Sequence, residues 1–470
     1  MGNIVIPSFS KNSLNSLPSS ALDSGSALIT VLAVLFILLT AFFAVFSLAL
    51  NRASFLHDEM NRIRASYLAE AGLNRFLHVS NSRQVNWKSA AATSLVHHPP
   101  GGGRYDVRAA LYGGYLAVSS RGTYKGRTVC RKALVGVLPW SDLNAAVVNC
   151  SMDYSLVLAG RSRITGDAIV GPEPIRPGSI SGEEFSGRKL VDGNICHRPN
   201  APFPEINREI IREYIKMTKS ARSDSAQRIY GSAIWQGQID IAPPHPDLII
   251  IGNDLEIYAA ELRSPDRPIT IIAGGNIRID GESRIDGLVQ FVAERSIVVA
   301  NGSRINDAVL LADDSLIIGG AAQFTGQAIC GGRIGINDRA EIRYPSLLYA
   351  YYPGHKGGSM ISFGRNTTSA VVAIAEGNTD PDSPPVDIIQ IDSGAVVKGT
   401  VICPEGTDIK GQLHGTSLTG YYYYYDEPTL YINWLKDAEI NRSRLDFLTV
   451  LPMSFAGRND YAILMMIDDD

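Results

Sequence analysis

The sequence predicts a mainly β protein with one long N-terminal transmembrane and amphipathic α-helix, a small antiparallel β-meander, and a right-handed parallel β-helix. Three observations predict this fold. An uncharged apolar run lies near the N-terminus, alternating strand-like runs joined by glycines follow it, and short Val, Ile and Leu runs then recur about every 20 residues. The chain has 470 residues, more than one hydrophobic core usually serves, so several structural units are expected.

The apolar run, Ala27–Leu50, contains no charged residue. At about 1.5 Å per residue, a helix of this length crosses the hydrocarbon core of a bilayer. A secretory signal peptide is the alternative, but its apolar region is normally about 7–15 residues and ends at a small-residue cleavage motif. Because Asn51 and Arg52 follow directly, we predict a membrane span at 27–50. Apolar residues then recur at steps of three and four, which predicts one long helix over 26–80.

The N-terminal residues resemble those of type IV pilin-like proteins. The stretch that begins GSALITVL at Gly25, the apolar run, and Tyr67–Asn74 (YLAEAGLN) are similar to the N-terminus of PilX-type minor pilins and large K-type pseudopilins. In those families a prepilin peptidase cuts after the glycine, and the helix packs into a filament or its tip. The resemblance implies a leader over 1–25, cleavage between Gly25 and Ser26, and other pilins or pseudopilins as partners.

The resemblance also implies a position and an orientation. Major pilins carry a glutamate five residues after the cut, whereas this chain has Thr30 there. K-type pseudopilins also lack that glutamate and sit at a filament tip, so a tip or minor position is implied. The helix would lie in the inner membrane, single-pass, with the C-terminal bulk periplasmic or at the cell surface. The positive-inside rule alone favours the opposite orientation, because Arg52, Arg62 and Arg64 follow the span.

Residues 81–140 are expected to form a small pilin-like β-sheet. Three alternating runs, at 105–111, 115–119 and 128–137, are joined by glycine-containing turns. A meander of this size buries one face against a neighbour, and the end of the long helix is the nearest candidate.

The strongest internal signal is a repeat. Ile285, Ile305, Phe324 and Ile342 occupy matching positions at spacings of 20, 19 and 18 residues. Short β-runs with glycine corners at such a period predict stacked coils, because no coil buries its apolar face alone. Residues 155–171 match 315–331 at eight of 17 positions, so the repeat extends well beyond this block.

We therefore predict a parallel β-helix over 141–420, with insertions near 172–245 and 343–387 and a C-terminal cap over 421–470. Its Gly-x-[Val/Ile] rhythm resembles bactofilins and other polymer-forming solenoids. Loops inserted at one corner of a solenoid gather on one face, and that face is commonly where partners bind.

Two tyrosine runs form a candidate binding surface. Its members are Tyr349, Tyr351, Tyr352, Tyr421, Tyr422, Tyr423, Tyr424 and Tyr425. Tyrosine offers a large amphipathic surface at low entropic cost and is enriched in binding patches. The same rings are equally suited to covering the last open coil of a solenoid, so binding and capping both stay open.

We predict neither catalysis nor a bound metal or cofactor. Acidic residues that a carbohydrate-active β-helix enzyme would use are present at Asp280, Asp286, Asp307, Asp313 and Asp314. Three of them sit beside Gly or Asn at predicted corners, where Asp is favoured for turn hydrogen bonds. The cysteines have no CxxC spacing, which disfavours zinc, and their disulfide pattern stays open: Cys130, Cys150, Cys196, Cys330 and Cys403. A net charge of -4 argues against nucleic acid.

The expected function is structural and non-enzymatic. The chain would be a minor pilin or pseudopilin-like component of a type IV pilus or type II secretion-like filament, and it would present its β-helix for adhesion or partner binding. A surface polysaccharide is one candidate partner. The alternatives are a membrane-tethered carbohydrate-active β-helix enzyme and a self-assembling bactofilin-like scaffold.

Overall fold

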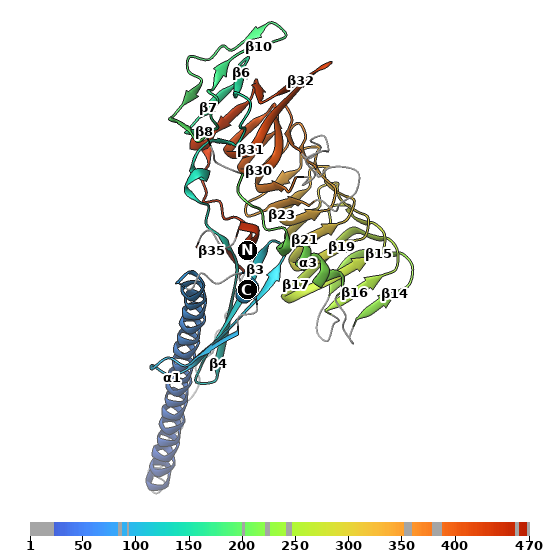
Figure 1. Cartoon of the computed structure of the whole chain (residues 1–470). Coiled ribbons are helices and arrows are strands. Elements are labelled where there is room, and N and C mark those ends of the chain that lie inside the picture. Colours follow the sequence, from blue (N-terminus) through green and yellow to red (C-terminus); the bar gives the residue numbers. More distant parts are fainter. Residues whose placement is uncertain are drawn as a thin grey trace, which may run out of the picture. The chain divides into compact units, whose positions relative to one another are not determined.

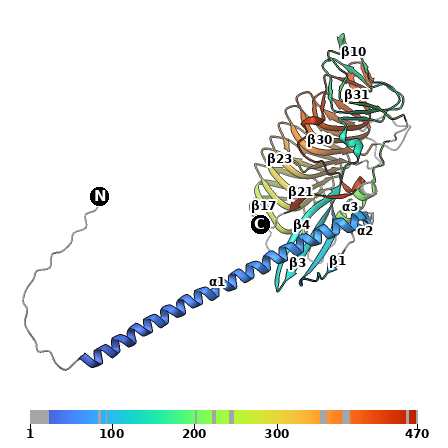
Figure 2. The same ribbon diagram turned by 90° about the vertical axis from the view of Figure 1, so that its left-hand side faces the viewer.

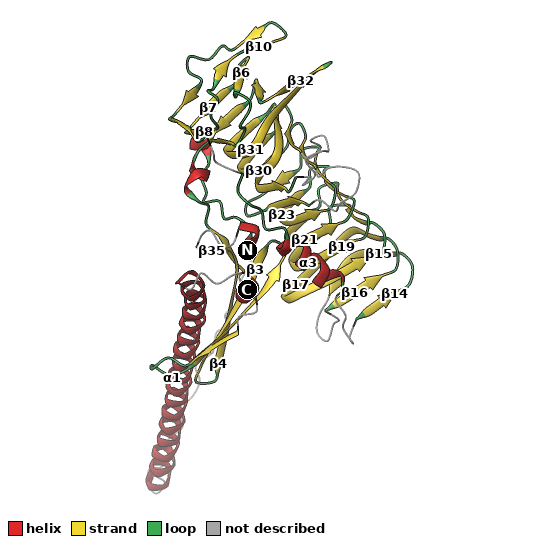
Figure 3. Cartoon of the chain, viewed as in Figure 1, coloured by secondary structure: helices red, strands yellow, loops and turns green. Residues whose placement is uncertain are grey.

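The structure is a computed structural model. It describes residues 23–82, 87–91, 94–199, 203–220, 226–240, 247–351, 360–377, 388–455 and 460–467. The fold is mainly β, with one long helix, an antiparallel sheet and a large sheet of parallel strands, as the sequence predicts (Figures 1 and 3). The chain divides into two units, residues 1–64 and 65–470, which we describe separately.

Helix α1 runs without interruption from Asp23 to Ser82. In the first unit the large apolar side chains from Leu28 to Leu50 are all exposed. Among the described residues, α1 is the one helix long and apolar enough to cross a membrane. Apolar surface on all sides of a helix requires lipid or neighbouring helices around it.

The second unit begins with an antiparallel sheet, called sheet A. It contains β1 (Ser94–His97), β2 (Arg104–Tyr112), β3 (Tyr115–Tyr124), β4 (Arg127–Val137) and β35 (Tyr461–Ile467), in that order. The short helix α2 (Trp87–Ala91) precedes it. The last turns of α1, from Ala65 onward, lie alongside sheet A (Figure 2), and Leu73 and Phe76 are buried against Val107 and Leu116.

The C-terminal strand corrects one prediction. Residues 421–470 were expected to cap the solenoid, but β35 pairs with β4 and completes sheet A. Of the strands in this range that precede β35, β32 (Thr429–Ile432) forms an antiparallel hairpin with the preceding strand, whereas β33 (Trp434–Lys436) and β34 (Glu439–Asn441) belong to the solenoid. The open edge of β4 can pair with the last strand of the chain. No local pattern in the sequence indicates this pairing.

The solenoid stacks coils that each place short strands on three sides. Its central strands are β16 (Leu248–Ile251), β17 (Leu255–Ala273), β18 (Ile277–Asp280), β19 (Arg284–Ala293), β20 (Ser296–Val299), β21 (Arg304–Ala312), β22 (Ser315–Ile318), β23 (Gln323–Cys330), β24 (Arg333–Ile336) and β25 (Glu341–Ile342). The predicted repeat is confirmed by the register, in which Ile285 pairs with Ile305, Ile305 with Phe324, and Phe324 with Ile342. Columns of buried Ile, Leu, Val and Phe fill the interior.

The stack continues with strands inside one predicted insertion. These are β26 (Leu347–Ala350), β27 (Met360–Phe363) and β28 (Thr368–Ala375), followed by β29 (Ile388–Ile391), β30 (Val396–Ile409) and β31 (Gln412–Asp426). The expected insertion at 343–387 is therefore not one block, because three strands of the stack lie within it. Of these, β26 and β28 pair with each other and occupy the same side of successive coils.

The order of coils in space differs from their order in the chain. The early strands are β5 (Val147–Asn149), β6 (Val157–Ala159), β7 (Arg163–Thr165), β8 (Ala168–Val170), β9 (Arg176–Pro177), β12 (Val191–Asp192) and β13 (Ile195–His197). They stack on the C-terminal coil: β5 pairs with β31, β6 with β33, and β7 with β34. Figure 1 shows β7 and β8 beside β31, far from β14.

The opposite end of the stack begins with β14 (Gln227–Ile229) and β15 (Ala233–Asp240). The predicted insertion at 172–245 thus contains coil strands from both ends of the stack. Besides the small hairpin of β10 (Ser179–Ile180) and β11 (Glu183–Glu184), it holds α3 (Glu209–Lys219), which lies on the chain segment that connects the two ends.

One side of the solenoid is apolar on its outer face and is covered. Val292, Leu311 and Ile374 on that face pack against Ile211 and Tyr214 of α3 in a second buried cluster, to which Tyr112 of sheet A also belongs. The hairpin between β2 and β3 docks at the same place, where Gln327 Nε2 donates to the Tyr112 carbonyl (2.9 Å) and the Gly114 N–H donates to Gln327 Oε1 (2.7 Å). Sheet A and the solenoid are therefore joined by a buried interface.

Candidate functional site

The tyrosine run of 421–425 lies on β31, where that strand leaves the solenoid as a hairpin with β32. In the hairpin Tyr423 pairs with Ile432, Tyr424 with Tyr431, and Tyr425 with Leu430. Successive residues of a strand point to opposite faces, so the run divides into an odd-numbered and an even-numbered set.

In the odd-numbered set Tyr425 is exposed, whereas Tyr423 is only 8% exposed. Tyr425 is 55% exposed and Leu430 is 53% exposed, and Tyr154, from the loop between β5 and β6, is 47% exposed. The ring centroids of Tyr154 and Tyr421 are 6.0 Å apart, and those of Tyr421 and Tyr423 are 6.3 Å apart. We call Tyr154, Tyr421, Tyr425 and Leu430 the tyrosine surface; the buried ring of Tyr423 lies beside it.

A buried amide pair fixes the tyrosine surface from below. Asn433 has φ of 63° and no exposed surface, and its side chain exchanges hydrogen bonds with Asn149 at 2.9 and 3.1 Å. Asn433 Nδ2 also donates to the Tyr154 carbonyl (2.8 Å), and the Tyr422 N–H donates to Asn433 Oδ1 (3.3 Å). The loop of Tyr154 and the strand of Tyr421 are thus held by one network. No pattern in the sequence indicates that residues 149–154 join this surface.

The charges that act on these rings are negative. Burial raises the pKa of Tyr421, and the carboxylate of Asp153 raises it further. Burial likewise raises the pKa of Tyr423 well above its usual value, and the carboxylate of Glu405 adds to the shift. Neutral phenol hydroxyls beside carboxylates are suited to hydrogen bonding with uncharged polar groups.

The even-numbered set serves the structure instead. Tyr422 is completely buried in the solenoid core. Tyr424 lies between two ammonium groups, Lys410 Nζ at 5.1 Å and Lys436 Nζ at 5.7 Å from its ring centroid. The run can therefore fill both predicted roles, binding surface and cover of a coil, with different tyrosines in each role.

The comparisons with known proteins add little to this geometry. No protein-family model matches the sequence, and no curated protein matches it. The competence-associated pilin ComZ from Thermus thermophilus is a similar solved structure, at 11% identity over 87% of this chain and 97% of that chain, with a TM-score of 0.18. A score of this size carries no argument about fold or function.

The first tyrosine run lies elsewhere in the fold. The prediction that it forms a binding surface is wrong for Tyr349 and Tyr351. Tyr349 has no exposed area, and Tyr351 is 8% exposed. Both belong to the cluster under α3, because β26 contributes to the covered side of the solenoid. Tyr351 Oη donates to Asp313 Oδ1 (3.2 Å). Tyr352 lies outside the described residues.

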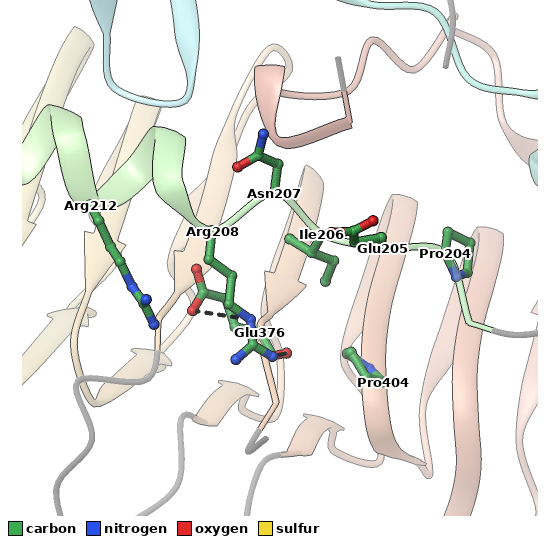
Figure 4. Close-up of a pocket in the computed structure, with 8 residues that line it drawn as sticks. All are labelled: Pro204, Glu205, Ile206, Asn207, Arg208, Arg212, Glu376 and Pro404. Carbon is green, nitrogen blue, oxygen red and sulfur yellow. Dashed lines mark hydrogen bonds and ion pairs between the residues drawn. The ribbon is translucent and has the colours of Figure 1, made fainter. Parts of the chain in front are cut away.

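Tyr349 instead takes part in a polar network beside a groove of about 530 Å³ (Figure 4). Its hydroxyl donates to Glu376 Oε1 (2.7 Å), and the carboxylate of Glu376 is completely buried. Arg208 Nη2 donates to the carbonyls of Glu376 (2.8 Å) and Gly377 (3.1 Å). Figure 4 shows Arg208 and Arg212 extending in the same direction from the chain at the start of α3. The network fastens that segment to the solenoid.

Three of the acidic residues weighed for catalysis, Asp280, Asp286 and Asp313, have structural partners. Burial alone would raise the pKa of Asp280, but hydrogen bonds from the Gly281 N–H, Arg278 and Asn301 hold it below its usual value. Asp286 Oδ1 accepts from Asn306 Nδ2 (2.6 Å), and Asp313 pairs with Lys219 of α3. Burial raises the pKa of Asp307, as does the charge of Asp286. Within the described part of the chain, no three His, Cys, Asp or Glu side chains gather as a metal site.

No disulfide joins any of the five cysteines, all of which lie in the described part of the chain. Cys330 and Cys403 are completely buried at matching coil positions, and burial raises the pKa of Cys330 to about 12. They act as small apolar residues.

The residues predicted for processing lie in α1. Gly25 and Ser26 fall in its first turn, and Thr30 is exposed one turn later. The structure gives their backbone as helical; cleavage and filament position stay predictions.

Proposed function

We propose that this chain is a membrane-anchored, non-enzymatic structural protein of the type IV pilin-like class, a minor pilin or pseudopilin. One observation supports this most strongly: a single helix combines an apolar segment exposed on all sides with a final segment buried against a small antiparallel sheet. The first part suits lipid or a bundle of like helices, and the second anchors a folded head.

In this proposal the helix resides in the inner membrane and the head lies in the periplasm or at the cell surface. Prepilin peptidase would cut between Gly25 and Ser26, and other pilins or pseudopilins would pack against the exposed part of α1. Thr30 in place of a glutamate supports a tip or minor position. The solenoid would then present its distal loops to a partner, with surface polysaccharide as the candidate.

Mass spectrometry of the membrane-derived protein tests the proposal. Expression with a prepilin peptidase is expected to yield a chain that starts at Ser26, and Gly25→Leu is expected to keep the leader. Gly2→Leu is the control, because it changes a leader glycine away from the cut. An intact N-terminus in the unmodified chain, or a cut elsewhere, would remove the pilin assignment.

A further inference from the structure

We propose that the tyrosine surface binds a polysaccharide without acidic groups. This rests on the proposed function only for the display of the solenoid outside the cytoplasm. The inference names the chemical class of the partner and the residues that contact it, which the fold and the anchor do not determine.

The first argument is the chemistry of the rings. A pyranose has hydroxyls at its rim and C–H groups on its faces, so it matches an aromatic ring that is apolar in the middle and polar at the tip. The ring of Tyr421 lies edge-on to that of Tyr154, with centroids 6.0 Å apart, and it also contacts the buried ring of Tyr423. Tyr425 and Leu430 add exposed surface farther along the hairpin as a cross-strand pair. A surface that follows a strand in this way suits consecutive units of an extended chain better than one small molecule.

The second argument is charge. Asp153 and Glu405 are the ionised groups that act on Tyr421 and Tyr423, while Lys410 and Lys436 lie over Tyr424 of the even-numbered set. Negatively charged surroundings repel uronic acids, phosphates and nucleic acids. Carboxylates at the rim also accept hydrogen bonds from sugar hydroxyls.

The third argument is rigidity. The buried pair Asn149 and Asn433 holds the Tyr154 loop to β31, so these rings are arranged before any ligand arrives. A pre-arranged surface loses less conformational entropy on binding. A flexible loop would not require a buried amide network beneath it.

Retention of the full chain in detergent by immobilised polysaccharides tests the inference. The probes are cellulose, xylan, mannan and starch, which are uncharged, and polygalacturonate, which is acidic. We expect retention by at least one uncharged probe, none by polygalacturonate, and little change with salt, because an uncharged ligand offers no charge to screen.

Variants connect the retention to the surface. Tyr425→Ala and Tyr154→Ala are expected to weaken it about tenfold each, since each removes an exposed ring. Tyr230→Ala and Tyr258→Ala are matched controls, because these rings are 93% and 47% exposed near the β14 end of the stack. Unchanged circular dichroism would show that every variant folds.

Three results would overturn the inference: retention by none of the uncharged probes, equal retention by polygalacturonate, or the same loss in the controls as in the surface variants. Displacement of the bound chain by a lysine-rich peptide would instead favour a cationic protein partner and also count against it. None of these results bears on cleavage after Gly25, so failure here is distinguishable from failure of the pilin assignment.

Discussion

At the scale of single residues, His414 is a titratable side chain buried in the solenoid. It lies on β31 and is 8% exposed. Burial lowers its pKa, and the positive charge of Arg444 lowers it further; Glu439 opposes them, and Lys398 adds the smallest lowering effect. Arg444 Nη1 is 3.2 Å from His414 Nε2, which fits a neutral imidazole that accepts.

This arrangement predicts a loss of stability in mild acid. The unfolded chain binds a proton on His414 near its ordinary pKa of about 6.5, whereas the folded chain resists until a lower pH. The contribution of His414 is therefore complete above pH 6.5 and declines as the pH falls toward the folded pKa. Urea unfolding of the full chain in detergent at several pH values measures it.

His414→Gln is expected to flatten that pH dependence. His98→Gln is the matched control, because His98 is exposed on the loop before β2. An equal slope in the unmodified chain and in His414→Gln would contradict the role given to His414.

At the scale of elements, the contact between α1 and β3 depends on a glycine. Gly122 lies where the helix backbone passes closest to the sheet, and a Cβ there would overlap the carbonyl oxygen of Ala65 and the amide of Ala69. Both alanines are completely buried. Small residues on the helix and a glycine on the strand thus allow a close approach that larger side chains would prevent.

Gly122→Val is expected to destabilise this unit by about 1–3 kcal/mol or more, because overpacking a tight contact displaces backbone. The free energy of unfolding in urea, with the full chain in detergent, measures the effect. Gly101→Ala is the control, since no atom lies within 4 Å of a Cβ at that position. Equal stability of Gly122→Val and the unmodified chain would show that helix and sheet are not packed this closely.

At the scale of the whole molecule, the stacking order joins distant parts of the chain. Leu435 of β33 is 1% exposed and pairs with Leu158 of β6, so the C-terminal coil supports the N-terminal one. A solenoid is stabilised by contacts between neighbouring coils, so a local defect acts first on the coils beside it.

Leu435→Ala removes buried side-chain volume at this junction, at an expected cost of about 2–5 kcal/mol. Hydrogen exchange is expected to accelerate in residues 157–177, although they lie far away in sequence, more than in β16. Leu255→Ala, equally buried near the β14 end, is the control and should show the reverse pattern. Faster exchange in β16 after Leu435→Ala would contradict the stacking order.

The features that depend on periodicity could be predicted from the order of residues alone. The apolar run predicted the exposed part of α1, glycine-linked alternation predicted the strands of sheet A, and the 18–20-residue spacing predicted the register of Ile285, Ile305 and Phe324. These patterns are local, because each records which face of a helix or strand is apolar.

Which distant parts of the chain meet could be seen only in the folded molecule. The stacking of β5 on β31, the addition of β35 to sheet A, and the arrival of Tyr154 beside Tyr421 are pairings between segments hundreds of residues apart. The open face of a terminal coil is apolar, and the edge of an unpaired strand carries unpaired amides. Many different neighbours could cover such a face or pair with such an edge. The same ambiguity applies to Tyr349 and Tyr425, which both lie in tyrosine-rich runs of the sequence. Tyr349 is buried under α3, whereas Tyr425 is exposed.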